Sequence, residues 1–367
     1  MSRPRLFYVL DSLEENEVGE QVATLLGRLS RARFEPRVVA LDPRGSLDAR
    51  LREMKVTVHR MELSGTMGAV LAVPRLRRLL AGLHADILQT FQPWSGTVAQ
   101  LAAPPGVEVF RWVQGLGSAP TTAEGRLKGW LERRASRRRS GRFIASDEDV
   151  VEPVRQRYRV DDVAVVPQAL DLGRIRTRVE AVTHRDARVR LGLSEGQRAV
   201  VALSDFQDRS RMYQLLEGFA TARTEEPGLR LFVVGQGPEE GTARGYAEEL
   251  RLEDSVIFLG SDPSRPSLLR VAEVVVDAGA WPGWAQASVE AMALPLPVLR
   301  WVDDDDDAGA QRYPDRTTGP ANRFARDVLD LLEDGKVRTE AARRSAELAS
   351  AHSVSTVADR WAELYTE

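Results

Sequence analysis

One carboxylate, Glu290, stands alone in the apolar segment ASVEAMAL, which runs from Ala287 to Leu294. The spacing of the apolar residues predicts an amphipathic helix, and the Pro-x-Pro that follows ends the helix and leads into a strand. The two oxygens of a carboxylate accept hydrogen bonds, so Glu290 can bind the hydroxyl groups of a ligand. A carboxylate in the first turn also stabilises its own helix through the helix dipole. The sequence leaves both roles open.

Five consecutive aspartates, Asp303–Asp307, form the one low-complexity tract of the chain. Adjacent carboxylates can bind Mg²⁺ or Ca²⁺, but this tract lacks the spaced oxygen ligands of a calcium loop. The same charges would repel a nucleotide diphosphate. We therefore expect a solvated loop, with no resident metal and no cofactor.

Six arginines gather in the segment ERRASRRRSGR. On a helix they would cover much of one face, and such a face can contact an anionic lipid surface or a lipid-linked acceptor. A solvated helix in an arginine-rich chain is the alternative interpretation. The arginines are Arg133, Arg134, Arg137, Arg138, Arg139 and Arg142.

The composition excludes several classes of protein. The chain of 367 residues contains no cysteine, so it has no disulfide framework, thiolate nucleophile or cysteine-based zinc site. Its four histidines are scattered, which argues against a histidine-rich metal site. The net charge of −3 argues against a general nucleic-acid binder. The first apolar run is too short for a signal peptide and no apolar stretch reaches about 18 residues, so we expect a cytoplasmic protein.

Short apolar runs alternate with helical patterns along the whole chain. The run RLFYVL (Arg5–Leu10) predicts a buried strand, and an arginine-rich polar stretch after Pro167 separates one strand–helix series from a second. Strands separated by helices indicate parallel sheets, so we predict an α/β fold of two doubly wound, Rossmann-like domains facing a central cleft. Three helices are predicted to close the chain, at Ala321–Leu332, Val337–Ala349 and Val354–Tyr365.

Four segments carry a family resemblance. One contains a strand, a Gly-x-Gly-Pro turn, a helix and a Val-x-Phe-Leu-Gly strand (LFVVGQGPEEGTARGYAEELRLEDSVIFLG), and the others read SVEAMALPLPVL, SVSTVADRWAELY and IASDEDVVEPVRQRYRVDDVAVVPQALD. Together they resemble glycosyltransferase family 4, retaining enzymes of the GT-B fold. The resemblance implies an acceptor-side domain at residues 1–180, a nucleotide-sugar-binding domain at 181–350, and a helix at 351–367 that crosses back to the first domain.

The resemblance also implies a phosphate-binding arginine and lysine just after the first strand of the second domain. The matching positions hold Asp205 and Ser210 here, and an acid is unfavourable beside a phosphate. The neighbouring Arg209 and Arg211 can replace the missing cations, because a guanidinium holds phosphate through paired hydrogen bonds. In that role they would stabilise the departing phosphate. Two solvated arginines are the alternative.

A pair of glutamates eight positions apart is the family's second donor-binding feature. Glu290 matches the second glutamate, which the resemblance makes a ligand of the nucleotide's ribose. The first position holds Pro282, which has neither charge nor hydrogen-bond donor. The flanking Trp281 and Trp284 can stack on a sugar or a base, or they can simply pack in the loop.

Two further features follow from the resemblance. The Gly-x-Gly turn at Gly235 and Gly237 is an expected nucleotide contact. In the first domain the family often has a histidine after the strand that matches VEVFRWV, near the reacting centre, and Gln114 stands there. A glutamine can hydrogen-bond in the sugar or acceptor site but cannot exchange protons.

Two functions fit these observations. In the first, the protein transfers a sugar, with retention, from a nucleotide-sugar donor to a hydroxyl of a glycan or lipid-linked acceptor. In the second, it is a catalytically degenerate relative that acts as a binding or scaffold partner. The replaced Arg, Lys, Glu and His favour the second function, and the Glu290 segment favours the first. The donor base, the sugar, the acceptor and the oligomeric state remain open.

Overall fold

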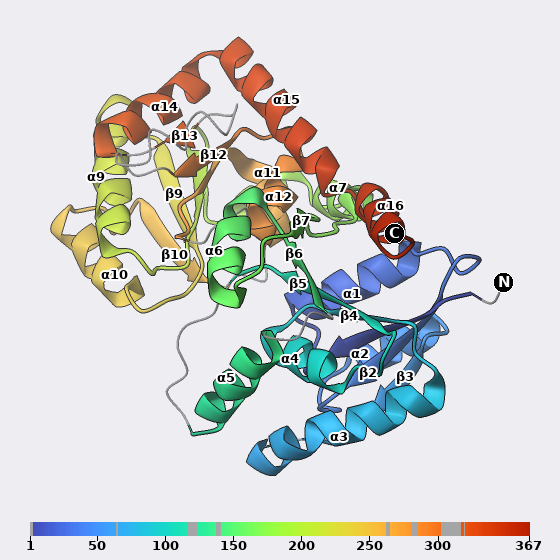
Figure 1. The fold of residues 1–367 in the computed structure, drawn as a ribbon. Coiled ribbons are helices and arrows are strands. Elements are labelled where there is room, and N and C mark those ends of the chain that lie inside the picture. Colours follow the sequence, from blue (N-terminus) through green and yellow to red (C-terminus); the bar gives the residue numbers. More distant parts are fainter. Residues whose placement is uncertain are drawn as a thin grey trace. The chain divides into compact units, whose positions relative to one another are not determined.

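The protein divides into two compact units of α/β structure (Figure 1). The first unit is Met1–Leu170 with Ser353–Glu367, and the second is Asp171–His352. The computed structural model describes residues 3–63, 65–115, 123–136, 141–261, 265–280, 285–301, 317–318 and 320–367.

The first unit contains a seven-stranded sheet in the order β3-β2-β1-β4-β5-β6-β7. All of its strand pairs are parallel. The chain order reverses between β1 and β4, which makes this the point where open α/β sheets bind ligands, at the carboxyl ends of the strands. The strands are β1 (Arg5–Leu10), β2 (Glu35–Ala40), β3 (Thr57–Arg60), β4 (Ile87–Thr90), β5 (Glu108–Val113), β6 (Gly141–Ala145) and β7 (Val163–Val165).

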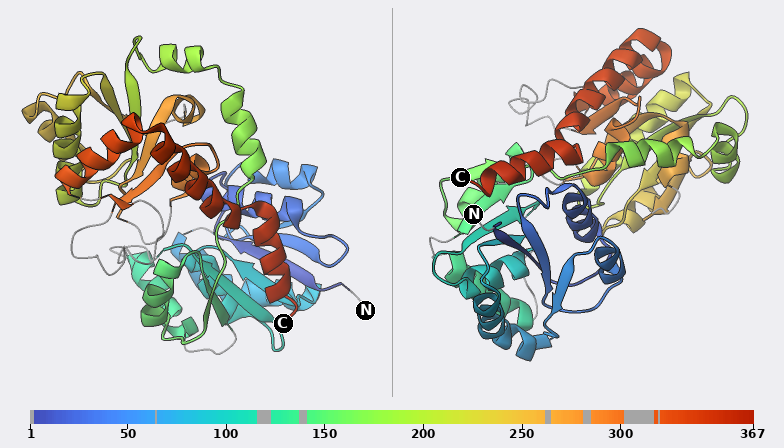
Figure 2. Two further views of the ribbon diagram at one scale, coloured as in Figure 1. Left: turned by 90° about the horizontal axis from the view of Figure 1, so that it is seen from above. Right: turned by 90° about the vertical axis from the view of Figure 1, so that its right-hand side faces the viewer.

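Helices cover both faces of this sheet (Figure 2). Because side chains alternate along a strand, Leu6, Tyr8 and Leu10 of β1 pack into one core cluster while Phe7 and Val9 pack into another. This double burial explains why β1 is apolar from Leu6 to Leu10. The helices are α1 (Glu17–Arg28), α2 (Leu47–Glu53), α3 (Gly65–Leu83), α4 (Pro93–Ala102), α5 (Ala123–Ser136), α6 (Glu148–Tyr158) and α16 (Val354–Leu364).

The second unit contains a six-stranded parallel sheet in the order β10-β9-β8-β11-β12-β13. Its order reverses between β8 and β11. The strands are β8 (Arg198–Leu203), β9 (Leu229–Val234), β10 (Val256–Gly260), β11 (Ala272–Asp277), β12 (Val298–Trp301) and β13 (Thr317–Thr318). The helices are α7 (Leu172–Glu180), α8 (His184–Arg190), α9 (Arg209–Glu225), α10 (Glu240–Glu249), α11 (Arg265–Val271), α12 (Gln286–Met292), α14 (Ala321–Glu333) and α15 (Gly335–Ala351).

The structure confirms the predicted pair of doubly wound α/β domains, and the cleft predicted between them stays a prediction. It divides the chain after residues 170 and 352, where the sequence analysis placed boundaries after 180 and 350. The polar stretch after Pro167 contains two helices that the sequence analysis did not predict. Helix α7 belongs to the second unit because it packs against α11 and because Arg176 Nε donates to the carbonyl oxygen of Ala293 at 2.7 Å.

Candidate donor site

Glu290 lies in α12, which begins near the carboxyl edge of the second sheet because it follows β11. Arg265 Nη1 donates to Glu290 Oε2 at 3.0 Å, and Gln286 Nε2 donates to Oε1 at 2.8 Å. The Glu290 side chain is 15% exposed. Among the residues that the structure describes, each carboxylate oxygen therefore has one protein partner in a half-buried setting, and lone pairs on both oxygens remain for a ligand.

The alternative role of Glu290 as the charge of the first helical turn is wrong. Helix α12 begins at Gln286, so Glu290 stands in its second turn, and the first turn contains no acidic residue. The helix starts one residue earlier than the apolar pattern indicates because Ala285 already adopts the extended N-cap conformation. The carboxylate therefore pairs with one side chain of its own helix, Gln286, and with Arg265 of α11.

Asp277 fixes the start of α12 from the last position of β11. Its Oδ2 accepts a hydrogen bond from Ser288 Oγ at 2.6 Å, and its Oδ1 accepts from the backbone N–H of Gly279 at 3.2 Å. Burial raises the pKa of the Asp277 carboxyl above its ordinary value, and the hydrogen bonds from Ser288 and Gly279 partly offset this effect. The carboxyl anchors the helix that carries Glu290.

We expect the buried carboxyl of Asp277 to give stability a specific pH dependence. Because its folded-state pKa lies above the ordinary value of 3.8, the native state binds the proton more tightly than the unfolded state. Stability from this group is therefore present at low pH and falls as the pH rises from about 3.8 through the folded-state pKa. Denaturant unfolding of the natural protein and of Asp277→Asn, compared at several pH values, should show the natural protein losing stability relative to the variant across this window. A difference that does not change with pH would contradict the prediction.

Asp205 and Arg211 both reach the loop that follows β11. The backbone N–H of Ala280 donates to the two oxygens of Asp205, at 3.3 and 3.2 Å. Arg211 Nη1 donates to the carbonyl oxygen of Gly279. Since Asp205 follows β8 and β8 pairs with β11, these groups gather where the strand order reverses. A negatively charged and a positively charged side chain therefore lie together at the edge where the phosphates are expected.

Arg209 pairs with Glu239. Its Nε donates to Glu239 Oε2 at 2.8 Å, and the Arg209 side chain is 59% exposed. This contact raises the pKa of the Arg209 guanidinium and lowers the pKa of the Glu239 carboxyl. Of the two arginines proposed from the sequence, only Arg211 contacts the loop between β11 and α12 within the described residues.

Gly235 and Gly237 are required by packing between two loops. Gly235 has a φ of +136°, and a Cβ there would lie 1.6 Å from the carbonyl oxygen of Ser204. A Cβ on Gly237 would lie 1.9 Å from the carbonyl oxygen of Asp205. The turn after β9 therefore lies directly against the segment that carries Asp205. A nucleotide contact at these glycines stays a prediction.

In the first unit, Gln114 directly follows β5, and its carbonyl oxygen accepts a hydrogen bond from Ser146 Oγ at 3.4 Å. Asp11, which is not among the site residues predicted from the sequence, follows β1 at the point where the strand order reverses. Asp11 Oδ1 accepts from the backbone N–H of Ser95 at 2.7 Å, and its own N–H donates to Gln92 Oε1 at 2.9 Å. Burial raises the pKa of the Asp11 carboxyl.

Several predicted features lie outside the described residues. They include the two tryptophans and the proline of the loop before α12, the five aspartates, and part of the basic cluster: Trp281, Pro282, Trp284, Asp303–Asp307 and Arg137–Arg139. Of the remaining cluster, Arg134 is exposed on α5, whereas Arg142 Nη2 pairs with Glu367 Oε2 at 2.7 Å. No helix in the described ranges is long and apolar enough to cross a membrane.

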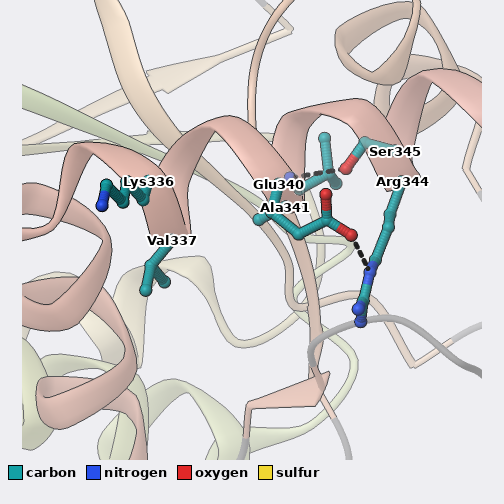
Figure 3. Close-up of a pocket in the computed structure, with 7 residues that line it drawn as sticks. Lys336, Val337, Glu340, Ala341, Arg344 and Ser345 are labelled. Atoms are coloured by element: carbon teal, nitrogen blue, oxygen red, sulfur yellow. Dashed lines mark hydrogen bonds and ion pairs between the residues drawn. The ribbon is translucent and has the colours of Figure 1, made fainter.

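Two hollows of the second unit lie at the opposite edge of the sheet. One of about 300 Å³ is lined by α15 and by Val298, the first residue of β12 (Figure 3). There Glu340 pairs with Arg344, and Ser345 Oγ accepts from the backbone N–H of Val298 at 3.1 Å. The other, of about 470 Å³, is lined by Arg176 and by residues of α15. Ligands of this fold class bind at the carboxyl edge, so neither hollow is the candidate donor site.

Both units match models of known protein families. Residues 16–169 match the model of the glycosyl transferase 4-like domain, and residues 184–300 match the model of glycosyl transferases group 1. The chain belongs to glycosyltransferase family 4. The second match contains the Glu290 helix, Arg211 and Arg265.

The relatives of this chain are distant. It is 26% identical over 160 residues to alpha-monoglucosyldiacylglycerol synthase of Streptococcus pneumoniae, an alignment that covers 42% of this chain and 36% of that protein. It is 27% identical over 168 residues to D-inositol 3-phosphate glycosyltransferase of Segniliparus rotundus, covering 44% of this chain and 36% of the relative. The alignments thus span well under half of these relatives' lengths.

Solved structures confirm the GT-B fold. HepE of Anabaena, crystallised with UDP, superposes with a TM-score of 0.74 at 16% identity and 99% coverage of both chains. WaaG, a glycosyltransferase of lipopolysaccharide biosynthesis, gives 0.66 at 14% identity, covering 98% of this chain and 99% of that chain. A UDP-N-acetylglucosamine 2-epimerase of Listeria monocytogenes gives 0.62 at 14% identity, covering 98% and 95%. The fold alone therefore does not fix the reaction, and the site must carry the argument.

Proposed function

We propose that this chain transfers a sugar from a nucleotide-sugar donor to a hydroxyl acceptor, and that the second unit holds the donor. The observation that carries the proposal is the carboxylate of Glu290, held by two side chains beside the carboxyl edge of a parallel sheet. A fixed carboxylate can accept hydrogen bonds from two ribose hydroxyls. Family membership supports the proposal, as do the structures of HepE with UDP and with UDP-glucose.

The proposed reaction proceeds with retention and without a metal or other cofactor. The acceptor oxygen bonds to the anomeric carbon on the face from which the diphosphate leaves. The bond between that carbon and the phosphate oxygen breaks, the diphosphate keeps the electron pair, and the hydroxyl proton passes to it. Gln114 cannot take this proton, so the main contribution of the protein is to stabilise charge on the leaving group.

Arg211 is the residue that we assign to this leaving group. It is anchored at the loop after β11, whereas Arg209 is paired with Glu239. An arginine can hold a phosphate through two N–H groups, and this arrangement strengthens as charge develops on the phosphate. Trp281, Trp284, Gly235 and Gly237 remain proposed contacts of the sugar and the nucleotide.

Calorimetric titration with UDP-, GDP- and ADP-sugars tests the donor site. We expect saturable binding of at least one donor, and Arg211→Ala should weaken it by about tenfold to hundredfold, since a hydrogen bond to a charged group contributes about 1.5–3 kcal/mol. Arg209→Ala is the matched control and should change the affinity by less than about twofold, because its exposed ion pair is far weaker. If no donor binds, the proposal fails, and if the two variants behave alike, the assignment of Arg211 fails.

A binding partner without catalysis is the second candidate, and Asp205 favours it. The Asp205 carboxylate already accepts the N–H of Ala280 at the edge where phosphate charge is expected. A fixed negative charge there opposes a diphosphate. Saturable donor binding without turnover, in the presence of sugar acceptors, would select this candidate.

The acceptor is proposed to be a glycan or a lipid-linked molecule, with peripheral membrane contact through Arg133–Arg142. Helix α5 supports this placement, because it carries the exposed Arg134 and because Trp130 is 53% exposed. An aromatic ring beside cationic side chains suits an anionic lipid surface. Arg142 pairs with Glu367, so we do not include Arg142 in the proposed surface.

A further inference from the structure

Arg265 joins two helices of the second unit through its contact with Glu290. It is the first residue of α11, which follows β10, whereas Glu290 lies in α12, which follows β11. Their ion pair at 3.0 Å therefore joins two segments that leave the same edge of the sheet. The Arg265 side chain is 38% exposed, so its outer N–H groups face solvent while its inner end is covered.

The inner end of the Arg265 guanidinium makes few hydrogen bonds. Its Nε is buried without a hydrogen-bond partner, and its contact with Glu290 is the one hydrogen bond that its guanidinium makes among the described residues. A buried N–H without an acceptor costs stability, and removing two charges from water costs more. A partly exposed ion pair contributes little to stability, so its stabilising effect alone does not account for the arrangement, and ligand binding offers a role for it.

The effect of Arg265 on Glu290 is specific. Arg265 holds Oε2, and Gln286, one helical turn before Glu290, holds Oε1. With one bond on each oxygen the carboxylate cannot rotate freely, yet each oxygen keeps a lone pair for another donor. Two acceptors at a fixed spacing are the complement of two neighbouring hydroxyl groups.

We infer that Arg265 is a positioning residue of the donor site, which fixes the Glu290 carboxylate so that it reads both ribose hydroxyls of the nucleotide. The inference rests on the proposed function, since it deepens the assignment of Glu290. It makes the second unit selective for ribonucleotides over 2′-deoxyribonucleotides. When one hydroxyl is missing, one oxygen of the half-buried carboxylate lacks a hydrogen-bond donor, and this loss is the physical source of the selectivity.

The test measures the affinities of UDP, GDP and ADP and of their 2′-deoxy forms by calorimetry on the full chain. For the base that binds best, we expect the natural protein to prefer the ribonucleotide by about tenfold or more. Arg265→Ala should weaken ribonucleotide binding and bring the ratio between the two forms close to one. Arg265→Lys should restore part of the ratio, because an ammonium can still pair with Glu290.

Arg343→Ala is the matched control, because Arg343 also pairs with a glutamate in the same unit, Glu340 at 2.7 Å on α15. It should leave both affinities unchanged. An unchanged ratio in Arg265→Ala, with the ribonucleotide still bound, would overturn this inference and leave the proposed function standing. Absence of binding of every nucleoside diphosphate to the natural protein would overturn both. Thermal unfolding followed by circular dichroism confirms that each variant is folded, and Arg265→Gln replaces Arg265→Ala if the alanine variant is not.

Discussion

Replacement of Glu290 by glutamine should weaken the binding of the nucleotide donor by about tenfold to hundredfold, and replacement by alanine by about hundredfold or more. Each hydrogen bond between a hydroxyl and the charged carboxylate contributes about 1.5–3 kcal/mol, and tenfold in affinity corresponds to about 1.4 kcal/mol. Glutamine keeps one acceptor oxygen but presents an amide donor in place of the other. Alanine removes both acceptors.

The effect of Glu290→Gln on KM and kcat is as informative as its effect on donor affinity. A ribose is remote from the breaking bond, so its contacts are equally strong in the ground state and the transition state. Loss of such uniform binding raises KM and leaves kcat nearly unchanged. The experiment is a steady-state comparison of Glu290→Gln with the natural protein, together with calorimetry for binding. A fall in kcat with an unchanged KM would contradict the assignment to the ribose.

The control for Glu290 is Glu340→Gln. Glu340 accepts hydrogen bonds from Arg343 and Arg344 on α15, at the opposite edge of the sheet. Figure 3 shows its contact with Arg344. This variant removes a glutamate that is paired with arginine, as Glu290 is, but it leaves the carboxyl edge intact. Equal losses of donor affinity in the two variants would indicate a general effect on the structure of the second unit. That result would contradict a specific role of Glu290.

The strand pattern was predictable because it depends on local spacing. Arg5–Leu10 forms β1 with the predicted bounds, and the closing helices α14, α15 and α16 fall within a few residues of the predicted ranges. Each of these helices buries one long apolar face, and β1 is buried on both faces. Their apolar residues therefore recur at a clear spacing in the sequence. Helices α7 and α8 were missed because each buries a single residue, Val179 and Ala187. The signals available were their N-caps, Asp171 and Thr183, which accept N–H bonds three residues on.

The candidate site was predictable only in part, because its partners come from distant segments. The Glu290 segment stands out by its own pattern. Its partner Arg265 lies 25 positions away and is one arginine among many, so nothing local distinguishes it. Asp205 stood out as an acid at a phosphate position, but its bond to Ala280, 75 positions away, depends on the pairing of β8 with β11. Periodicity predicts which residues are buried, and it does not predict which side chains meet at the edge of a sheet.

Replacement of Trp361 by alanine should destabilise the first unit by about 3–5 kcal/mol, the usual cost of removing a buried aromatic ring and leaving a cavity. Trp361 is 1% exposed in α16, the last helix of the chain, which packs against α1. Its ring lies 6.4 Å from that of Phe110 in edge-on geometry and 5.6 Å from that of Tyr365. Tyr365 in turn donates its hydroxyl to Gln89 Oε1 at 3.2 Å.

The large effect is expected because α16 completes a core made by residues far earlier in the sequence. The aromatic cluster of α16 packs against β5 and β4 of the first unit, although the whole second unit intervenes in the chain. Burial raises the pKa of Tyr365 well above its ordinary value of 10.0, as expected for a hydroxyl sealed from water. Loss of Trp361 therefore opens the core of the first unit and leaves the second unit intact.

The measurement for Trp361→Ala is urea unfolding followed by circular dichroism, with hydrogen exchange to locate the change. Protection should fall in residues 3–170 and 353–367 and persist in the second unit. Trp130→Ala is the matched control, because Trp130 is 53% exposed on α5 and its loss should cost less than about 0.5 kcal/mol. Similar stability of the two variants would mean that α16 is not part of the first unit's core. Loss of protection in both units would mean that they unfold together, so that α16 couples the stability of one unit to the other.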